Sequence, residues 1–336
     1  MKMSTIKDVA QLAGLSIATI SKYINGGNVL EDNRRLIADA IEKLDYKVNH
    51  AARTLKTNKT MTIGVLLPSI NTPFFATICA NIEQQLQLEG FSMFICSYYD
   101  DPEEELNKVR FFIDKNVDGI LLVPHSVTAD DLMSIAEIQE RKTPIVLMDR
   151  SIDGFDRVLT DNSSAVHAAV EKLIISGHRR IGIIIGPDDI TTANERKIGY
   201  ERVHADYSIP IDRELIRVGD YSIGSGYEQM NALLSMDEPP TAVMGTNHEM
   251  TVGAITAAYE RKLIIPDDIS FIGYDEIQLT RIFNPPITTV LQPMEKIAQN
   301  AAELILMRIR GDYSSYPQVI RLKTEMLEHE SIGKVR

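Results

Sequence analysis

Short β-rich runs alternate with longer helical segments through most of this 336-residue chain, and this alternation constrains the fold more than any other feature. The first run, Thr62–Leu67, is largely apolar, as expected for a parallel strand that is buried on both faces. A similar series restarts at Arg180. Because strands and helices alternate in two successive series, the sequence predicts two doubly wound α/β lobes.

Each series supplies several strands and helices. The first predicts strands at 62–67, 91–97, 119–123 and 144–148, with helices near 74–89, 102–115 and 129–140. The second predicts strands at 180–186, 215–219, 241–245 and 269–273, with helices near 191–206, 224–235 and 247–261. Apolar residues make up 44% of the chain, which is enough for the large core that two such lobes require.

Polar and aromatic residues follow several of these strands, at the edge where ligands of such sheets bind. Aromatic faces combined with an arginine and an aspartate suit a polyhydroxylated ligand, which needs a stacking surface and charged hydrogen-bonding partners. For the two aromatic residues, Phe74 and Tyr221, packing in the core is nearly as good an interpretation as ligand binding. The residues at these strand ends are Asn71, Phe74, Asp149, Arg196, Tyr221, Asn247 and Asp275.

The first 60 residues differ in charge from the rest of the chain. They contain ten Lys or Arg residues against six Asp or Glu residues, whereas the remainder contains 25 against 41. A small basic segment joined to an acidic body is expected where one end of a protein meets phosphate groups, although a solvated surface would also fit.

Residues 5–25 have the pattern of two short helices joined by a tight turn. Thr5 suits the N-cap of the first helix, Gly14 ends it, and Ser16 begins the second. A third helix at about 32–44 closes a small core. This pattern indicates a helix-turn-helix, and periodicity alone leaves a generic helical hairpin open. The expected core residues are Ile6, Val9, Ala10, Ala13, Leu15, Ile20, Ile24, Leu36, Ile37, Ala40, Ile41 and Leu44.

The run from Thr5 to Gly26, TIKDVAQLAGLSIATISKYING, resembles the start of the lactose-repressor (LacI/GalR) family of bacterial transcription regulators, and the resemblance continues to about residue 325. It implies a small all-α helix-turn-helix head (1–47), a hinge helix and linker (48–60), and a two-lobed α/β effector domain like periplasmic binding proteins (61–336). Lobe one is expected at about 61–160 and 292–325, and lobe two at about 161–288. The return to lobe one through Thr288–Leu291, a helix at 294–310 and a strand near 319–322 also rests on this resemblance.

The resemblance further implies which residues contact DNA. Ile17, Ala18 and Lys22 occupy base-reading positions, and Lys22 replaces an arginine that is common there. The segment 49–56 resembles the hinge helix, with Leu55 as the apolar wedge that opens a base step. Val48 stands where a proline is frequent. The expected DNA-contacting residues are Thr5, Ser16, Ile17, Ala18, Thr19, Ser21, Lys22, Asn25, Asn49, Ala52, Leu55 and Lys56.

Six residues match effector-binding positions of the family. One of them, Gln292, is not among the strand-end residues named above, so the resemblance adds it to the candidate site. Relatives often carry Asn-Asp where this chain has Asn247-His248, and the chain has no tryptophan to stack on a ligand. The resemblance implies a small sugar-like effector that changes the affinity for a palindromic operator. The matching residues are Phe74, Arg196, Tyr221, Asn247, Asp275 and Gln292.

Other classes of function lack support in the sequence. We find no catalytic set, no metal-ligand spacing among the seven histidines and no cofactor motif, so we expect neither an enzyme nor a cofactor or metal. No apolar run is long enough to span a membrane and no export signal precedes the first helix, so we expect a cytoplasmic protein whose Cys79 and Cys96 are reduced.

The expected partners are operator DNA, a small-molecule effector and a second copy of the chain. Two alternatives stay open at this stage. A solute-binding protein of a transporter would share the body fold but would leave residues 1–60 without a purpose. A regulator controlled mainly by a partner protein would keep the head, and no surface motif in the sequence marks such a partner.

Overall fold

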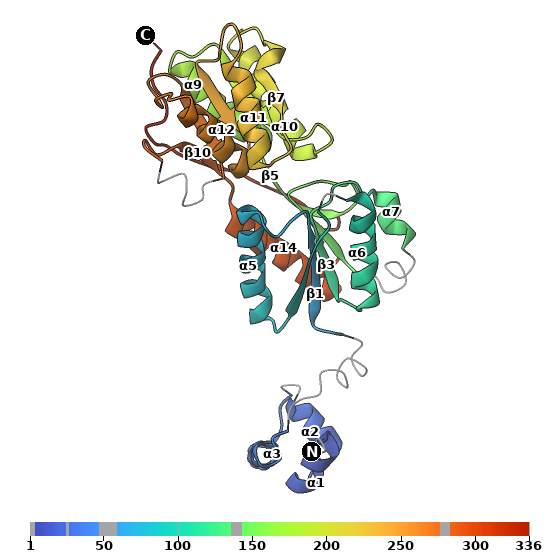
Figure 1. Ribbon diagram of the computed structural model, residues 1–336. Coiled ribbons are helices and arrows are strands. Elements are labelled where there is room, and N and C mark those ends of the chain that lie inside the picture. Colours follow the sequence, from blue (N-terminus) through green and yellow to red (C-terminus); the bar gives the residue numbers. More distant parts are fainter. Residues whose placement is uncertain are drawn as a thin grey trace. The chain divides into compact units, whose positions relative to one another are not determined.

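A computed structural model describes residues 4–24, 27–46, 59–99, 101–135, 143–275 and 283–335 (Figure 1). The chain divides into two compact units, Met1–Thr60 and Met61–Arg336, which we call the head and the body. Asn25, Asn49, Ala52, Leu55 and Lys56, all expected to contact DNA, lie outside the described residues.

The head contains three helices, α1 (Ile6–Ala13), α2 (Ile17–Ile24) and α3 (Glu31–Lys43). Thr5 and Asp8 form a reciprocal capping box at the start of α1, and Gly14 ends that helix in the left-handed conformation with φ of 67°. The Ser16 hydroxyl accepts a hydrogen bond from the Thr19 N–H (3.1 Å), as an N-cap residue should. These local signals confirm the predicted helix-turn-helix.

A small core holds the three helices together. Val9, Ile20 and Ile37 are completely buried at its centre, and Leu15 and Ile24 pack against it. Leu36 was expected in this core, but its side chain is 48% exposed. Ile37, also expected there, does face the core, so of these two neighbours on α3 only Leu36 is presented to solvent.

The first lobe of the body is a six-stranded parallel sheet with helices on both faces. Its strand order is β11-β5-β4-β3-β1-β2. Helices α5 and α14 pack on one face, and α6 and α7 on the other (Figure 1). The elements are β1 (Thr62–Leu67), α5 (Pro73–Leu88), β2 (Ser92–Ser97), α6 (Pro102–Asp114), β3 (Gly119–Leu122), α7 (Ala129–Ser134), β4 (Ile145–Met148), β5 (Asp156–Thr160), α14 (Met294–Ile309) and β11 (Val319–Leu322).

The second lobe repeats this architecture with the strand order β12-β10-β9-β8-β6-β7. All its pairings are parallel except that of β12 with β10. Helices α9 and α10 cover one face, and α11 and α12 the other (Figure 1). The elements are α9 (Asn162–Ile175), β6 (Ile181–Ile185), α10 (Thr191–Asp206), β7 (Ile216–Val218), α11 (Ile223–Leu234), β8 (Ala242–Gly245), α12 (His248–Glu260), β9 (Ser270–Tyr274), β10 (Thr288–Leu291) and β12 (Glu325–Leu327).

The chain passes between the two sheets three times, after β5, after β10 and after β11. The expected return to lobe one through Thr288–Leu291 is wrong, because this strand pairs with β9 and belongs to the second sheet, before the crossing. The boundary drawn at residue 288 therefore moves past Leu291. The third passage takes the chain back to lobe two, where β12 bonds the edge of β10, so lobe one ends before residue 325.

Candidate functional site

A cavity of about 190 Å³ lies where strands of both sheets end, and both lobes contribute to its wall. Its position agrees with the rule that ligands bind beyond the carboxyl ends of parallel strands. The cavity is smaller than the roughly 300–1,000 Å³ typical of sites for drug-sized ligands, so a small ligand fits it best. Its lining residues are Pro68, Ser69, Thr72, Phe74, Phe75, Asp149, Arg150, Thr192, Arg196, Asp220, Tyr221, Ser222, Asn247, Glu249, Asp275 and Gln292.

The structure brings together seven of the eight residues that the sequence singled out. Asn71 does not line the cavity: it is exposed, and its N–H donates to the Ser69 hydroxyl in the turn before α5 (3.2 Å). Sequence reasoning missed several lining residues, among them Arg150, Thr192 and Glu249. Each lies within two residues of a strand end or at the start of a helix, so the strand-end rule applied to neighbouring positions would have found them.

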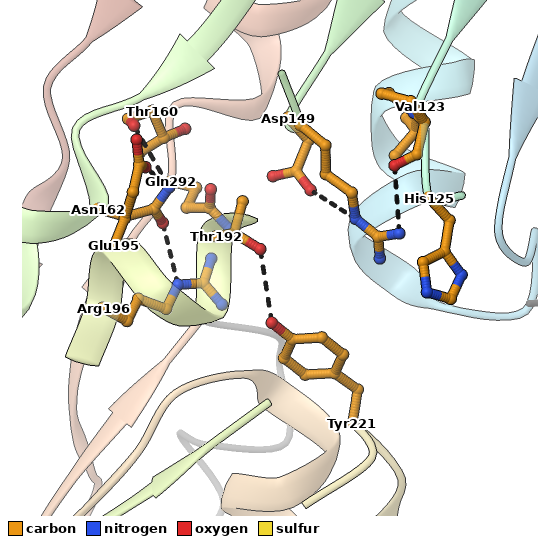
Figure 2. A network of polar contacts seen from close by, with 12 residues as sticks. Val123, His125, Asp149, Thr160, Asn162, Thr192, Glu195, Arg196, Tyr221 and Gln292 are labelled. Atoms are coloured by element: carbon orange, nitrogen blue, oxygen red, sulfur yellow. Dashed lines mark hydrogen bonds and ion pairs between the residues drawn. The ribbon is translucent and has the colours of Figure 1, made fainter. Parts of the chain in front are cut away.

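Arg196, from the first half of α10, is held rigidly in the cavity wall. Its Nε donates to Asn162 Oδ1 (2.9 Å) and its Nη1 to the Thr246 carbonyl (2.6 Å). The guanidinium also stacks over the Tyr274 ring, 4.2 Å from its centroid. The side chain is 4% exposed, so these protein contacts fix its orientation in the cavity wall (Figure 2).

Asp275 follows β9 and is fixed by Gln292, whose Nε2 donates to both carboxylate oxygens (3.0 and 3.2 Å). Burial raises the pKa of Asp275 to about 7, although Arg196 and Gln292 act in the opposite direction. Burial also raises the pKa values of Asp149 and Glu249, two of the other three carboxyl groups that line the cavity. The cavity therefore contains hydrogen-bond acceptors whose ionised form is destabilised by burial when no ligand donates to them.

Three residues of the wall adopt the left-handed backbone conformation that L-residues disfavour. Asp149, Tyr221 and Asp275 have φ values of 63°, 66° and 61°. Such a conformation costs roughly 1–3 kcal/mol at a residue other than glycine. Gly186 makes room for Tyr221, because a Cβ at that position would lie only 2.0 Å from the tyrosine ring. Three of the nine described residues other than glycine with this conformation therefore line the cavity.

Asp275→Asn is expected to stabilise the ligand-free protein at pH 8. The folded state holds a proton on Asp275 up to about pH 7, whereas the unfolded chain loses it near 3.8, so stability falls as the pH rises through this window. Each pKa unit corresponds to about 1.36 kcal/mol, which limits the gain to about 4 kcal/mol. Urea unfolding at pH 5 and pH 8 measures it, with the exposed Asp237→Asn as the control. A variant no more stable than wild type at pH 8 would contradict the assignment.

Five of the residues that the resemblance places against DNA lie on helix α2 of the head. Ile17, Ala18 and Lys22 are exposed, and Thr19 and Ser21 are half-buried beside them. Ala18, Thr19 and Lys22 also line a shallow hollow with residues 28–31 and Asn33. The side chains of Thr5 and Ser16 serve as helix caps, so any contact they make with DNA adds to a structural role.

Within the described ranges, no three His, Cys, Asp or Glu side chains gather as they would to hold a metal ion. In the same ranges, no helix combines the length and apolarity that crossing a membrane requires.

A helix-turn-helix head and a two-lobed body with a cavity at the strand ends of both sheets together define a DNA-binding transcriptional regulator with an effector-binding domain. The family model of bacterial regulatory proteins of the lacI family matches residues 5–49, and that of periplasmic binding proteins and the sugar-binding domain of the LacI family matches residues 60–330. The chain belongs to the LacI family, which confirms the resemblance and the fold class that the sequence indicated.

Curated relatives extend over the whole chain. The HTH-type transcriptional repressor PurR of Actinobacillus pleuropneumoniae serotype 3 (strain JL03) is 36% identical over 334 residues, which cover 98% of each protein. PurR of Haemophilus influenzae (strain PittEE) is 36% identical over 337 residues, covering 99% of this chain and all of the relative. Because both relatives are repressors aligned from head to body, the chain is a LacI-family transcriptional regulator rather than a transporter component.

Solved structures agree with this assignment. The lac repressor dimer bound to operator and the anti-inducer ONPF has a TM-score of 0.86 at 25% identity, covering 98% of this chain and 99% of that one. The complex of the transcriptional regulator CelR with cellobiose has a TM-score of 0.73 at 28% identity, with the same coverage. A regulator from Enterococcus faecium with bound ribose has a TM-score of 0.73 at 27% identity, covering 82% of this chain and all of that one.

Proposed function

We propose that the cavity between the lobes binds an uncharged, sugar-like effector that changes the affinity of the head for a palindromic operator. The observation that carries this proposal is the pairing of Arg196 and Asp275. Both are buried in one wall, both are fixed by neighbouring side chains, and both have hydrogen-bonding capacity directed at the same small space. Phe74 and Tyr221 add the aromatic faces on which a sugar ring stacks.

The charges of the wall favour a neutral ligand over a phosphorylated one. Asp149, Asp220, Glu249 and Asp275 outnumber the two arginines, Arg150 and Arg196. Both guanidiniums are also partly committed to the protein, because Arg150 Nη1 donates to the Tyr98 hydroxyl and the Pro124 carbonyl (3.4 Å each). A phosphate would therefore meet four carboxyl groups against two guanidiniums. The structures of relatives with cellobiose and ribose support a sugar.

Thermal unfolding of the full-length chain tests the effector class. Ribose, glucose and cellobiose are the neutral probes, with ribose 5-phosphate, glucose 6-phosphate, adenine and guanine as the competing classes. We expect at least one neutral sugar to raise the midpoint, because a ligand at 100 times its Kd stabilises the native state by about 2.7 kcal/mol. The same sugar should change operator affinity. A rise with only the phosphorylated sugars or only the nucleobases would overturn the proposed class.

For the DNA side, we propose that Ile17, Ala18 and Lys22 read base edges and that Leu55 acts as a wedge in the minor groove. The exposure of the first three on α2 supports this role. A head of three helices reads few base pairs, so we propose a two-fold dimer on a palindrome, as in the lac repressor dimer bound to operator. The protein would act in the cytoplasm as a regulator without a catalytic step.

A further inference from the structure

A connected set of polar side chains leads from the ligand cavity to strand β11 of the first lobe. Arg196 donates to Asn162, as described above, and Asn162 Nδ2 donates to Glu195 Oε2 (3.0 Å; Figure 2). Glu195 Oε1 in turn accepts from Arg321 Nη1 (3.0 Å). Because Glu195 lies on α10 of lobe two and Arg321 on β11 of lobe one, the last bond joins the two lobes.

The side-chain amide of Asn162 fixes which groups donate and which accept in this chain of hydrogen bonds. It is the first residue of α9, directly after the first crossing, and it is completely buried. Its Oδ1 accepts from Arg196 and from the Tyr274 hydroxyl (3.1 Å), and its Nδ2 donates to Glu195 and to the Thr160 carbonyl (3.3 Å). A flipped amide would face donors with donors and acceptors with acceptors, so only one orientation is compatible with its surroundings.

Arg321 lies beside two of the three crossings between the lobes. It belongs to the strand that precedes the third crossing, and its Nη1 also approaches the carbonyl of Thr160, which ends the strand before the first crossing (3.4 Å). A change in the angle between the lobes turns the chain at these crossings. Glu195 and Arg321 must then move relative to each other, because they belong to different lobes.

We propose that Glu195 and Arg321 are positioning residues that set the size of the effector response. Their ion pair favours the lobe arrangement described here, and the adjacent Arg196 is the residue through which a ligand acts on α10. A ligand that moves Arg196 therefore competes with the pair, and the pair's strength enters the free-energy difference between the two arrangements. This inference rests on the proposed effector role of the cavity.

A double-mutant cycle tests the pair. The variants are Glu195→Gln, Arg321→Gln and the double variant, with the within-lobe pair Lys172–Glu328 (2.6 Å) mutated in the same way as the matched control. The measured quantity is the ratio of operator affinities without and with saturating sugar, on a duplex selected by the wild-type protein from a random palindrome library. The sugar is the probe among ribose, glucose and cellobiose that binds the wild type. Thermal stability is measured in parallel.

We expect each single variant to change this ratio by about two- to fivefold, the range for a partly exposed ion pair. The double variant should match the single variants, because removing either partner already breaks the bond. The control variants should leave the ratio unchanged at comparable stability. A wild-type response that persists unaltered in the two single variants and the double variant of Glu195 and Arg321, or strictly additive effects, would overturn the inference alone. A wild type that responds to none of the sugars would overturn the proposed function, and this inference with it.

Discussion

Arg196→Ala is expected to lower the affinity for the effector by about 10- to 100-fold, and Asp275→Ala should have a similar effect. A hydrogen bond to a charged group contributes roughly 1.5–3 kcal/mol, and each 1.4 kcal/mol corresponds to a tenfold change in affinity. Both residues are at least 95% buried in the cavity wall, so water does not replace the lost contacts easily. Titration calorimetry with the neutral sugar that stabilises the wild type measures the change.

Operator binding without effector should be unaffected in both variants, since neither residue belongs to the head. Arg202→Ala is the matched control, because Arg202 lies on the same helix, is exposed and donates to the Ser163 hydroxyl (3.3 Å). Unchanged calorimetric affinity in both Arg196→Ala and Asp275→Ala would remove this cavity from consideration. A loss of stability in the ligand-free state would instead assign a structural role to the residue concerned, which for Arg196 would reflect its bonds to Asn162 and Thr246.

Elements with a continuous apolar pattern were predictable from the sequence, and those stabilised by distant partners were not. Strand β5 escaped prediction because it begins with Asp156 and Arg157. Asp156 is completely buried and accepts two hydrogen bonds from Arg308 (2.7 and 3.0 Å), a residue 152 positions later. Strand β12 is three residues long and exists because it bonds the edge of β10. Arg308 and β10 are both distant in the sequence from the strands they stabilise, so a local sequence pattern cannot reveal them.

The site was predictable to the same extent. The strand-end rule located Asp149, Arg196 and Asp275 because parallel strands bring their carboxyl ends together. The rule does not specify which way a loop residue faces, and Asn71 accordingly turned outward. Asn162 was missed because a buried asparagine at the start of a helix has no sequence signal beyond that of an ordinary capping region. Its role depends on hydrogen bonds to four residues from three elements, and on its place directly after the first crossing between the lobes.

Leu55→Ala is expected to weaken specific operator binding by about tenfold or more and to reduce the bend in the DNA. The hinge segment 49–56 is only about two helical turns long, too short to be stable alone in water, so we propose that it folds when two copies meet on the operator. Insertion of Leu55 would unstack a base step at a cost of a few kcal/mol, offset by a bend that brings more protein onto the backbone. Gel shifts with a circular-permutation bending assay measure both quantities.

Two comparisons separate the wedge from a general loss of affinity. Binding to non-operator DNA should change little in Leu55→Ala, because it depends on phosphate neutralisation by Lys and Arg. Lys22→Ala should instead reduce discrimination among operator sequences while leaving the bend on those it still binds, since Lys22 is exposed on α2, where we propose that it reads base edges. Leu88→Ala, which truncates a leucine that is 82% exposed in the body, is the control for loss of an exposed apolar side chain. If Leu55→Ala binds and bends the operator as the wild type does, the hinge acts in this protein by pairing alone, and the effector would control operator affinity without a wedge.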